Sequence, residues 1–149
     1  MEIERKFLVN EAIWAQLSKP APKRIQQAYL SDDSHCTVRV RTKGAKGFLT
    51  IKGKSVGISR SEYEYEIPLE EAEKMIAEFC SKVLSKDRYE IQVGKHLWEV
   101  DVFHGKLEPL IVAEIELSSE DESFELPEWV DREVSDDVEY YNSRLILKL

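Results

Sequence analysis

Apolar and charged residues alternate with a period of two along most of this chain, which is the pattern of β-strands with one buried face. In the first segment, Glu2, Glu4 and Lys6 stand against the apolar residues Ile3 and Phe7. The pattern predicts strands over residues 2–9, 24–31, 36–43, 47–53, 61–67, 86–93, 96–104 and 111–118, with a further short strand near 132–134. Because glycines between neighbouring segments mark hairpins, we expect an antiparallel sheet.

Two stretches have apolar residues at helical spacing instead. Asn10 is a suitable N-cap for a helix over Glu11–Ser18. A second helix is expected over Leu69–Val83, and a short third one from about Asn142 to Leu149. We therefore predict an α+β fold in which helices pack on the apolar outer face of the sheet.

The charged residues of the strands come largely in pairs of one sign, such as Arg39 with Arg41 and Glu114 with Glu116. An antiparallel sheet in an interaction module can expose one charged face to water. The pairing by sign, together with an opposite face that is apolar enough to need covering, favours another arrangement. Closing such a sheet with its charged face inward would make a polar lumen, as an eight-stranded barrel can.

A charged lumen needs counter-charges, because buried unpaired charge is costly. Carboxylates two residues apart on a strand lie roughly 7 Å apart, so they can converge on one cation. Oxygen ligands without His or Cys select Mg²⁺ or Mn²⁺. The basic set needs an anion with several oxygens; it comprises Lys6, Arg39, Arg41, Lys52, Lys86 and Arg88. A metal-bridged polyphosphate satisfies both sets.

Length and composition set outer limits. The 149 residues are expected to form one domain, 1–149. A formal net charge of −8 argues against nucleic acid as a partner, since duplex binding normally needs a basic surface. No apolar run approaches the ~18 residues that span a bilayer, and the N-terminus lacks the apolar core of a signal peptide, which predicts no membrane partner and a cytoplasmic location. The cysteines and histidines have no zinc-binding spacing.

An ordered series of motifs resembles the CYTH domain, or triphosphate tunnel metalloenzyme family, in its short bacterial members. The series opens with E-I-E-R-K at residues 2–6, which is similar to the family's E-x-E-x-K signature. It continues with Q-A-Y-L (Tyr29), Arg39 and Arg41, T-I-K (Lys52), R-S-E-Y-E (Glu62, Glu64), K-D-R-Y (Lys86, Arg88), E-V-D-V-F (Asp101), A-E-I-E-L (Glu114, Glu116) and the closing Y-Y-N-S-R-L. The first motif alone occurs easily by chance, whereas the ordered set is specific and covers most of the chain.

The resemblance implies a closed antiparallel eight-stranded β-barrel, a tunnel with a charged lumen and helices packed outside. It further implies that the tunnel holds a triphosphate and a divalent metal. It implies metal ligands at Glu2, Glu4, Glu114 and Glu116, a second metal site with the attacking water at Glu62 and Glu64, and an assisting role for Asp101. The implied substrate-binding residues are Lys6, Tyr29, Arg39, Arg41, Lys52, Lys86 and Arg88. Catalytic roles are expected for Glu62, Glu64, Lys6 and Lys86. Several relatives carry a lysine in the C-terminal helix, and Arg144 is the nearest candidate for that position.

The predicted function is metal-dependent hydrolysis of a triphosphate, foremost inorganic tripolyphosphate to pyrophosphate and phosphate, by a monomer or homodimer. Three alternatives stay open: a class IV-type adenylate cyclase, a thiamine triphosphatase, and a non-catalytic polyphosphate- or nucleotide-binding module. A thiamine ring needs an aromatic or apolar slot, which Trp14, Trp98 and Trp129 could supply, although packing is the simpler expectation for each. The presence of Glu62 and Glu64 favours an enzyme over a binding module.

Overall fold

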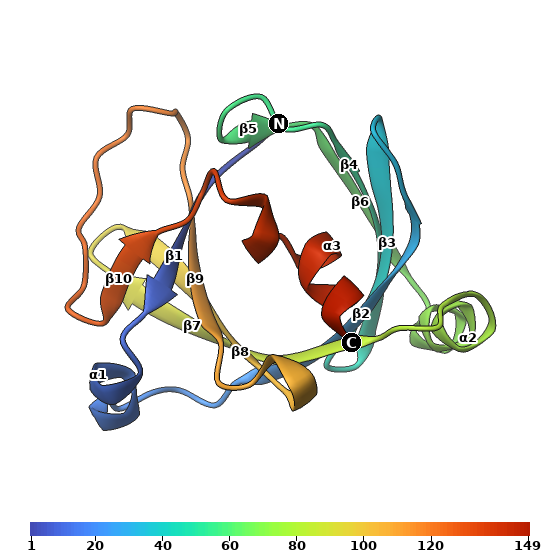
Figure 1. Ribbon diagram of the computed structural model, residues 1–149, viewed down its shortest axis with the longest axis horizontal. Helices are drawn as coiled ribbons and strands as arrows, with labels where there is room; N and C mark the ends of the chain where they lie inside the picture. The colour runs from blue at the N-terminus through green and yellow to red at the C-terminus, as the bar shows by residue number, and fades with distance from the viewer.

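One strongly curled antiparallel sheet forms the body of the computed structural model, which describes residues 1–149 (Figure 1). Its strands are β1 (Glu2–Val9), β2 (Lys23–Asp32), β3 (Cys36–Lys43), β4 (Lys46–Gly53), β5 (Ser59–Arg60), β6 (Glu62–Ile67), β7 (Leu84–Val93), β8 (His96–Phe103), β9 (Ile111–Glu116) and β10 (Val130–Glu133). The helices are α1 (Glu11–Gln16), α2 (Leu69–Phe79) and α3 (Asn142–Leu145), with 3₁₀ turns at Gly105–Leu107, Val138–Tyr140 and Ile146–Lys148. The predicted α+β class and antiparallel sheet are confirmed. None of the helices combines the length and the apolar character needed to cross a membrane.

The sheet closes on itself only at one end. Its hydrogen-bonded order is β10-β1-β9-β8-β7-β2-β3-β4-β6. β5 pairs with the start of β1, at Glu2↔Arg60 and Ile3↔Ser59, and the chain then continues into β6. Beyond that contact β6 pairs only with β4, because β10 occupies the edge of β1 around Phe7. In place of the expected fully closed barrel, the structure is a curled sheet that closes only where β5 meets β1. The strand expected over 61–67 is preceded by the separate strand β5.

Aromatic residues form the core on the outer face of β1, β8 and β9. Phe7 and Trp98 point outward from the strands, and Trp14 of α1 and Trp129 cover them. The ring centroids of Trp98 and Trp129 lie 5.6 Å apart, and those of Trp14 and Trp129 lie 5.7 Å apart. All three tryptophans are thus buried in this cluster, which is the packing role expected for them from the sequence.

α2 covers the outer face of β3 and β4, where the backbones approach closely. A Cβ atom on Gly47 would lie 2.7 Å from the Cβ of Ala72, so glycine is required there. Both long helices end earlier than predicted, α1 at Gln16 and α2 at Phe79. For α2 the reason is the next strand, because Leu84 already pairs with β2.

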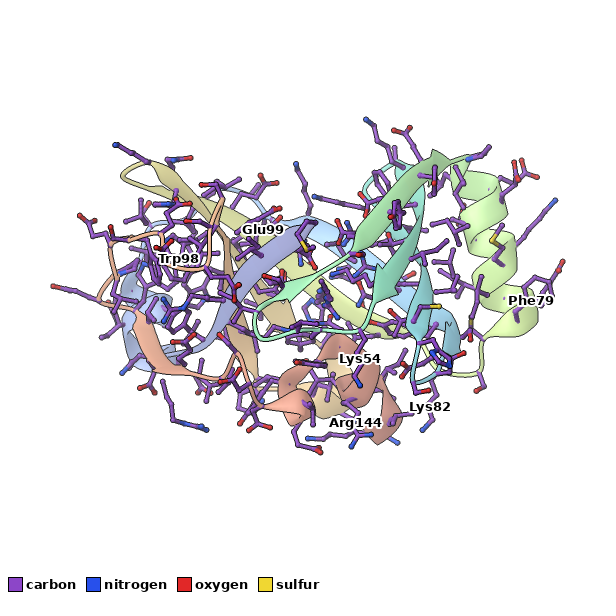
Figure 2. The ribbon with its side chains drawn as sticks, turned by 90° about the horizontal axis from the view of Figure 1, so that it is seen from above. Lys54, Phe79, Lys82, Trp98, Glu99 and Arg144 are labelled. Carbon is purple, nitrogen blue, oxygen red and sulfur yellow. The ribbon has the colours of Figure 1, made fainter.

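The C-terminal segment, residues 142–149, covers one opening of the curled sheet. α3 lies across the opening between the strands in Figure 1, and Figure 2 places it on one side of the sheet. Leu145 and Ile146 are buried against Ala28, Leu84 and Phe103 in a second apolar cluster. Apolar side chains therefore fill this end, and the charged residues occupy the rest of the interior.

Candidate active site

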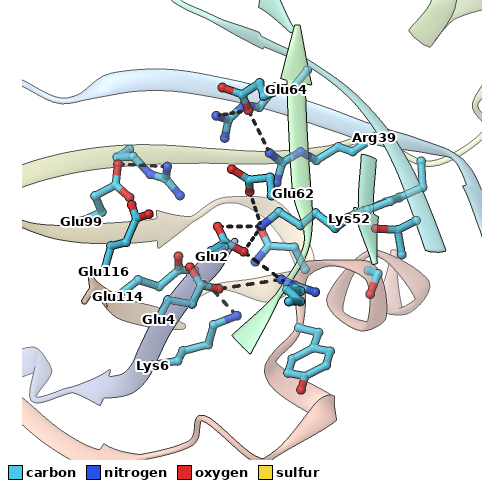
Figure 3. A pocket seen from close by; sticks show the side chains of 18 of the residues that line it. Glu2, Glu4, Lys6, Arg39, Lys52, Glu62, Glu64, Glu99, Glu114 and Glu116 are labelled. Atoms are coloured by element: carbon cyan, nitrogen blue, oxygen red, sulfur yellow. Dashed lines mark hydrogen bonds and ion pairs between the residues drawn. The ribbon is translucent and has the colours of Figure 1, made fainter. Parts of the chain in front are cut away.

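The interior of the curled sheet holds a cavity of about 280 Å³ with an almost wholly polar lining. It is lined by Glu2, Glu4, Lys6, Tyr29, Thr37, Arg39, Arg41, Lys43, Lys52, Arg60, Glu62, Glu64, Lys86, Arg88, Glu99, Glu114, Glu116, Tyr141, Asn142 and Ser143. Every predicted site residue except Asp101 is among them, and Figure 3 shows how their side chains converge. The alternation of the strands explains this, because alternate side chains of a strand point to the same face.

β1 and β9 form an acidic wall of the cavity. Their pairing places Glu4 directly opposite Glu116, although like charges in that position repel each other. Burial and the Glu114 carboxylate raise the pKa of Glu4 to about 8. Burial and the carboxylate of Glu2 also raise the pKa of Glu116. The neighbouring cations therefore do not fully compensate Glu4 and Glu116. At Glu114, by contrast, burial raises the pKa but the Lys6 and Arg88 charges outweigh burial and lower the pKa to about 2.

Lys52 links the acidic wall to β6, and Arg60 of β5 pairs with the same wall. The Lys52 ammonium lies 3.1 Å from Glu2 and 3.2 Å from Glu62. The Arg60 guanidinium lies 3.3 Å from Glu2 and 3.7 Å from Glu4. These ion pairs draw Glu2 and Glu62 together at the end of the cavity where β5 closes the sheet (Figure 3).

The opposite wall, on β3 and β7, is basic. Arg39 and Arg41 share a single carboxylate, Glu64, at 3.7 and 3.4 Å. Burial and repulsion from Arg39 lower the pKa of Arg41 to about 10. The Nε atoms of both arginines are buried and have no hydrogen-bond partner. This wall has more positive charge than its own carboxylates neutralise.

Asp101 lies behind the basic wall rather than in the cavity lining. Its carboxylate accepts hydrogen bonds from Arg88 Nε at 2.8 Å and from Lys86 Nζ at 2.7 Å, and all three side chains are almost wholly buried. Burial raises the pKa of Asp101, but the Arg88 and Lys86 charges outweigh burial and hold it well below its usual range. Both oxygens of Asp101 thus already orient the two cations, and a metal-assisting role for this residue stays a prediction.

Some lining residues went unrecognised in the sequence: Thr37, Lys43, Arg60, Glu99, Tyr141, Asn142 and Ser143. Lys43 and Glu99 continue the alternation of their strands, so that signal could have found them. Arg60 and the 141–143 segment lie in no long alternating stretch, but both fall within quoted motifs, R-S-E-Y-E and Y-Y-N-S-R-L, and that signal could have found them. Arg144, the candidate from the tail, lies outside the lining and pairs with Glu139 at 3.6 Å.

The donor chemistry of the acidic wall suits a divalent cation. Glu2, Glu4, Glu114 and Glu116 offer only carboxylate oxygens, which are the ligands that Mg²⁺ and Mn²⁺ prefer. The raised pKa values of Glu4 and Glu116 show that more positive charge would be stabilising there. No three acidic, histidine or cysteine side chains are gathered closely enough to form a ready-made metal cluster. The residues thus fit a cation that draws them together when it binds.

Comparison with known proteins points to one family. The model of the CYTH domain matches residues 1–144. An inorganic triphosphatase of Acetivibrio thermocellus is 47% identical over 146 residues, which cover 97% of this chain and 92% of the relative. An inorganic triphosphatase of Nitrosomonas europaea is 35% identical over 152 residues, with 99% and 98% coverage. A crystal structure of an inorganic triphosphatase, 33% identical, superposes with a TM-score of 0.69 and covers 100% of this chain and 96% of its own.

Proposed function

Because the chain belongs to the CYTH domain family, we propose that it hydrolyses inorganic tripolyphosphate to pyrophosphate and phosphate with the help of Mg²⁺ or Mn²⁺. The observation that carries the proposal is the separation of uncompensated charge across the cavity. Glu4 and Glu116 lack sufficient positive charge on one side, and Arg39 and Arg41 lack sufficient negative charge on the other. A divalent cation would supply the missing positive charge, and a triphosphate would supply the missing negative charge.

The overall charge of the lining explains what a divalent cation would contribute. Seven carboxylates and eight cationic side chains line the cavity, so the two signs nearly balance before any ligand binds. A triphosphate adds several negative charges to this balance. An accompanying divalent cation, held by Glu2, Glu4, Glu114 and Glu116, would neutralise them and polarise the phosphoryl oxygens.

The remaining side chains have roles that follow from their places. Arg39, Arg41, Lys86 and Arg88 clamp the phosphoryl oxygens and stabilise the charge that develops on the leaving phosphate, with Lys6, Tyr29 and Lys52 completing the clamp. Glu62 and Glu64 orient the attacking water and accept its proton. Asp101 acts as a positioning residue, since it fixes Lys86 and Arg88 from behind.

The cavity favours an inorganic substrate over the alternatives. An adenylate cyclase or a thiamine triphosphatase must hold an aromatic ring, and ring-binding pockets are mostly apolar. Here the only aromatic lining residues are Tyr29 and Tyr141. Trp14, Trp98 and Trp129 lie in the outer core and offer no slot in the cavity. Glu62 and Glu64 face the cavity, which supports an enzyme rather than a binding module.

Phosphate release from tripolyphosphate, measured with Mg²⁺ and with Mn²⁺, tests the proposal. EDTA and Glu116→Gln serve as controls, and ATP, thiamine triphosphate and pyrophosphate run beside it. We expect fast metal-dependent release from tripolyphosphate, slow release from ATP, and a loss of about a hundredfold in Glu116→Gln. Cyclic AMP formed from ATP would favour the cyclase. Tight binding of tripolyphosphate without release from any substrate would leave a binding module.

The place and partners of the protein are part of the same proposal. We expect it to act in the cytoplasm as a monomer or homodimer, with a small-molecule triphosphate as its partner and no nucleic acid or membrane. Size-exclusion chromatography with light scattering measures the oligomeric state.

A further inference from the structure

Asn142, the first residue of α3, reaches the cavity from the C-terminal segment. Its side-chain Oδ1 accepts a hydrogen bond from Lys86 Nζ at 2.9 Å and another from Gln27 Nε2 at 2.9 Å. Lys86 belongs to the basic wall, and Gln27 is fully buried in β2. Asn142 therefore connects the tail of the chain to a residue of the proposed phosphate clamp.

The two contacts determine which way the amide of Asn142 faces. A lysine ammonium can only donate hydrogen bonds, so the Asn142 atom facing Lys86 must be the oxygen. The Gln27 atom that contacts the same oxygen must then be its nitrogen. With both lone pairs of Oδ1 engaged, the Asn142 Nδ2 group is left, and it donates no hydrogen bond within the protein. A residue that lines the cavity thus has an unused donor beside Lys86.

We propose that Asn142 binds the triphosphate directly, donating from Nδ2 to a phosphoryl oxygen while its Oδ1 holds the Lys86 ammonium in place. The inference rests on the proposed function for the identity of the ligand. A neutral donor is useful at this position, because it binds an anionic oxygen without adding repulsion to the neighbouring cations of the basic wall. Burial of Leu145 and Ile146 fixes the start of α3, so the donor is held on an anchored segment.

Direct binding separates this inference from the proposal about hydrolysis. Calorimetric titration of inorganic tripolyphosphate into the full chain in EDTA measures affinity without metal-dependent turnover. Asn142→Asp keeps the acceptor for Lys86 and Gln27 but replaces the donor with a second oxygen, and Asn142→Ala removes both. Ser143→Asp is the matched control for added charge, since Ser143 also lines the cavity. Arg144→Ala tests a neighbour outside it, and thermal unfolding checks that each variant folds.

We expect Asn142→Asp to raise the Kd for tripolyphosphate more than tenfold and more than Ser143→Asp does, and Asn142→Ala to raise it about tenfold. Arg144→Ala should bind like the wild type. If Asn142 only positioned Lys86, Asn142→Asp would bind better than Asn142→Ala, and that order would overturn the inference. If the wild type binds tripolyphosphate without hydrolysing it, and the Kd values of the variants follow the expected order, the proposed hydrolysis is refuted but the inference about Asn142 is upheld. If the wild type hydrolyses tripolyphosphate but Asn142→Asp binds it as tightly as the wild type does, the hydrolysis is upheld and the inference about Asn142 is refuted.

Discussion

Glu4 is a carboxylate whose ionisation the fold disfavours. The nearest cation is Arg60, at 3.7 Å, and Arg60 is shared with Glu2. Burial and the nearby Glu114 raise the pKa of Glu4 from 4.5 to about 8. A divalent cation bound at Glu4 would therefore compete with a proton for this carboxylate.

The raised pKa of Glu4 predicts how stability depends on pH. Between pH 4.5 and 8 the folded state binds a proton that the unfolded state does not bind, so the stabilising contribution is complete below pH 4.5 and is lost as the pH rises through about 8. In EDTA, we expect the free energy of unfolding in urea to fall more steeply over this range in the wild type than in Glu4→Gln, which stays neutral. Glu66→Gln, which alters an exposed carboxylate, should keep the wild-type slope. Parallel slopes for wild type and Glu4→Gln would contradict this reading.

At the scale of elements, the alternation of the sequence predicts the strands well, because side-chain direction in a strand is a local property. It places Arg39, Arg41, Lys86 and Arg88 on one inner face, as the structure has them. The closure of the sheet, in contrast, is not determined by local sequence. It depends on where β5 and β10 meet β1, which no short segment encodes. The same holds for Asn142, whose position depends on how the tail packs back on the sheet.

Weakening the packing of the C-terminal segment should measurably lower the free energy of unfolding. Leu145 is 1% exposed and packs in the apolar cluster that fills one end of the sheet, whereas Leu147, two residues on, is 58% exposed. We expect Leu145→Ala to lower the free energy of unfolding by about 2–5 kcal/mol, since it leaves a cavity in the core. Leu147→Ala should lower it by less than about 1 kcal/mol. Urea denaturation followed by circular dichroism measures both, and equal losses would show that the tail is not anchored through Leu145.

At the scale of the whole molecule, one curled sheet holds two walls of opposite charge against each other. β1 and β9 supply carboxylates, and β3 and β7 supply cations. An outer layer of aromatic residues on one side and α2 on another supports this arrangement from outside. The sequence motifs predict the inner residues, but they do not show that Asp101 lies behind the basic wall, because that depends on the burial of Lys86 and Arg88 around it.

The most direct test of the account is a crystal structure of Glu116→Gln, as a slowed enzyme, grown with tripolyphosphate and Mn²⁺, because the anomalous signal of manganese locates the ion. The account predicts phosphate density between Arg39, Arg41, Lys86 and Arg88, with manganese against the acidic wall at Glu2, Glu4 or Glu114. Tripolyphosphate bound outside the cavity, or manganese away from the acidic wall, would contradict it.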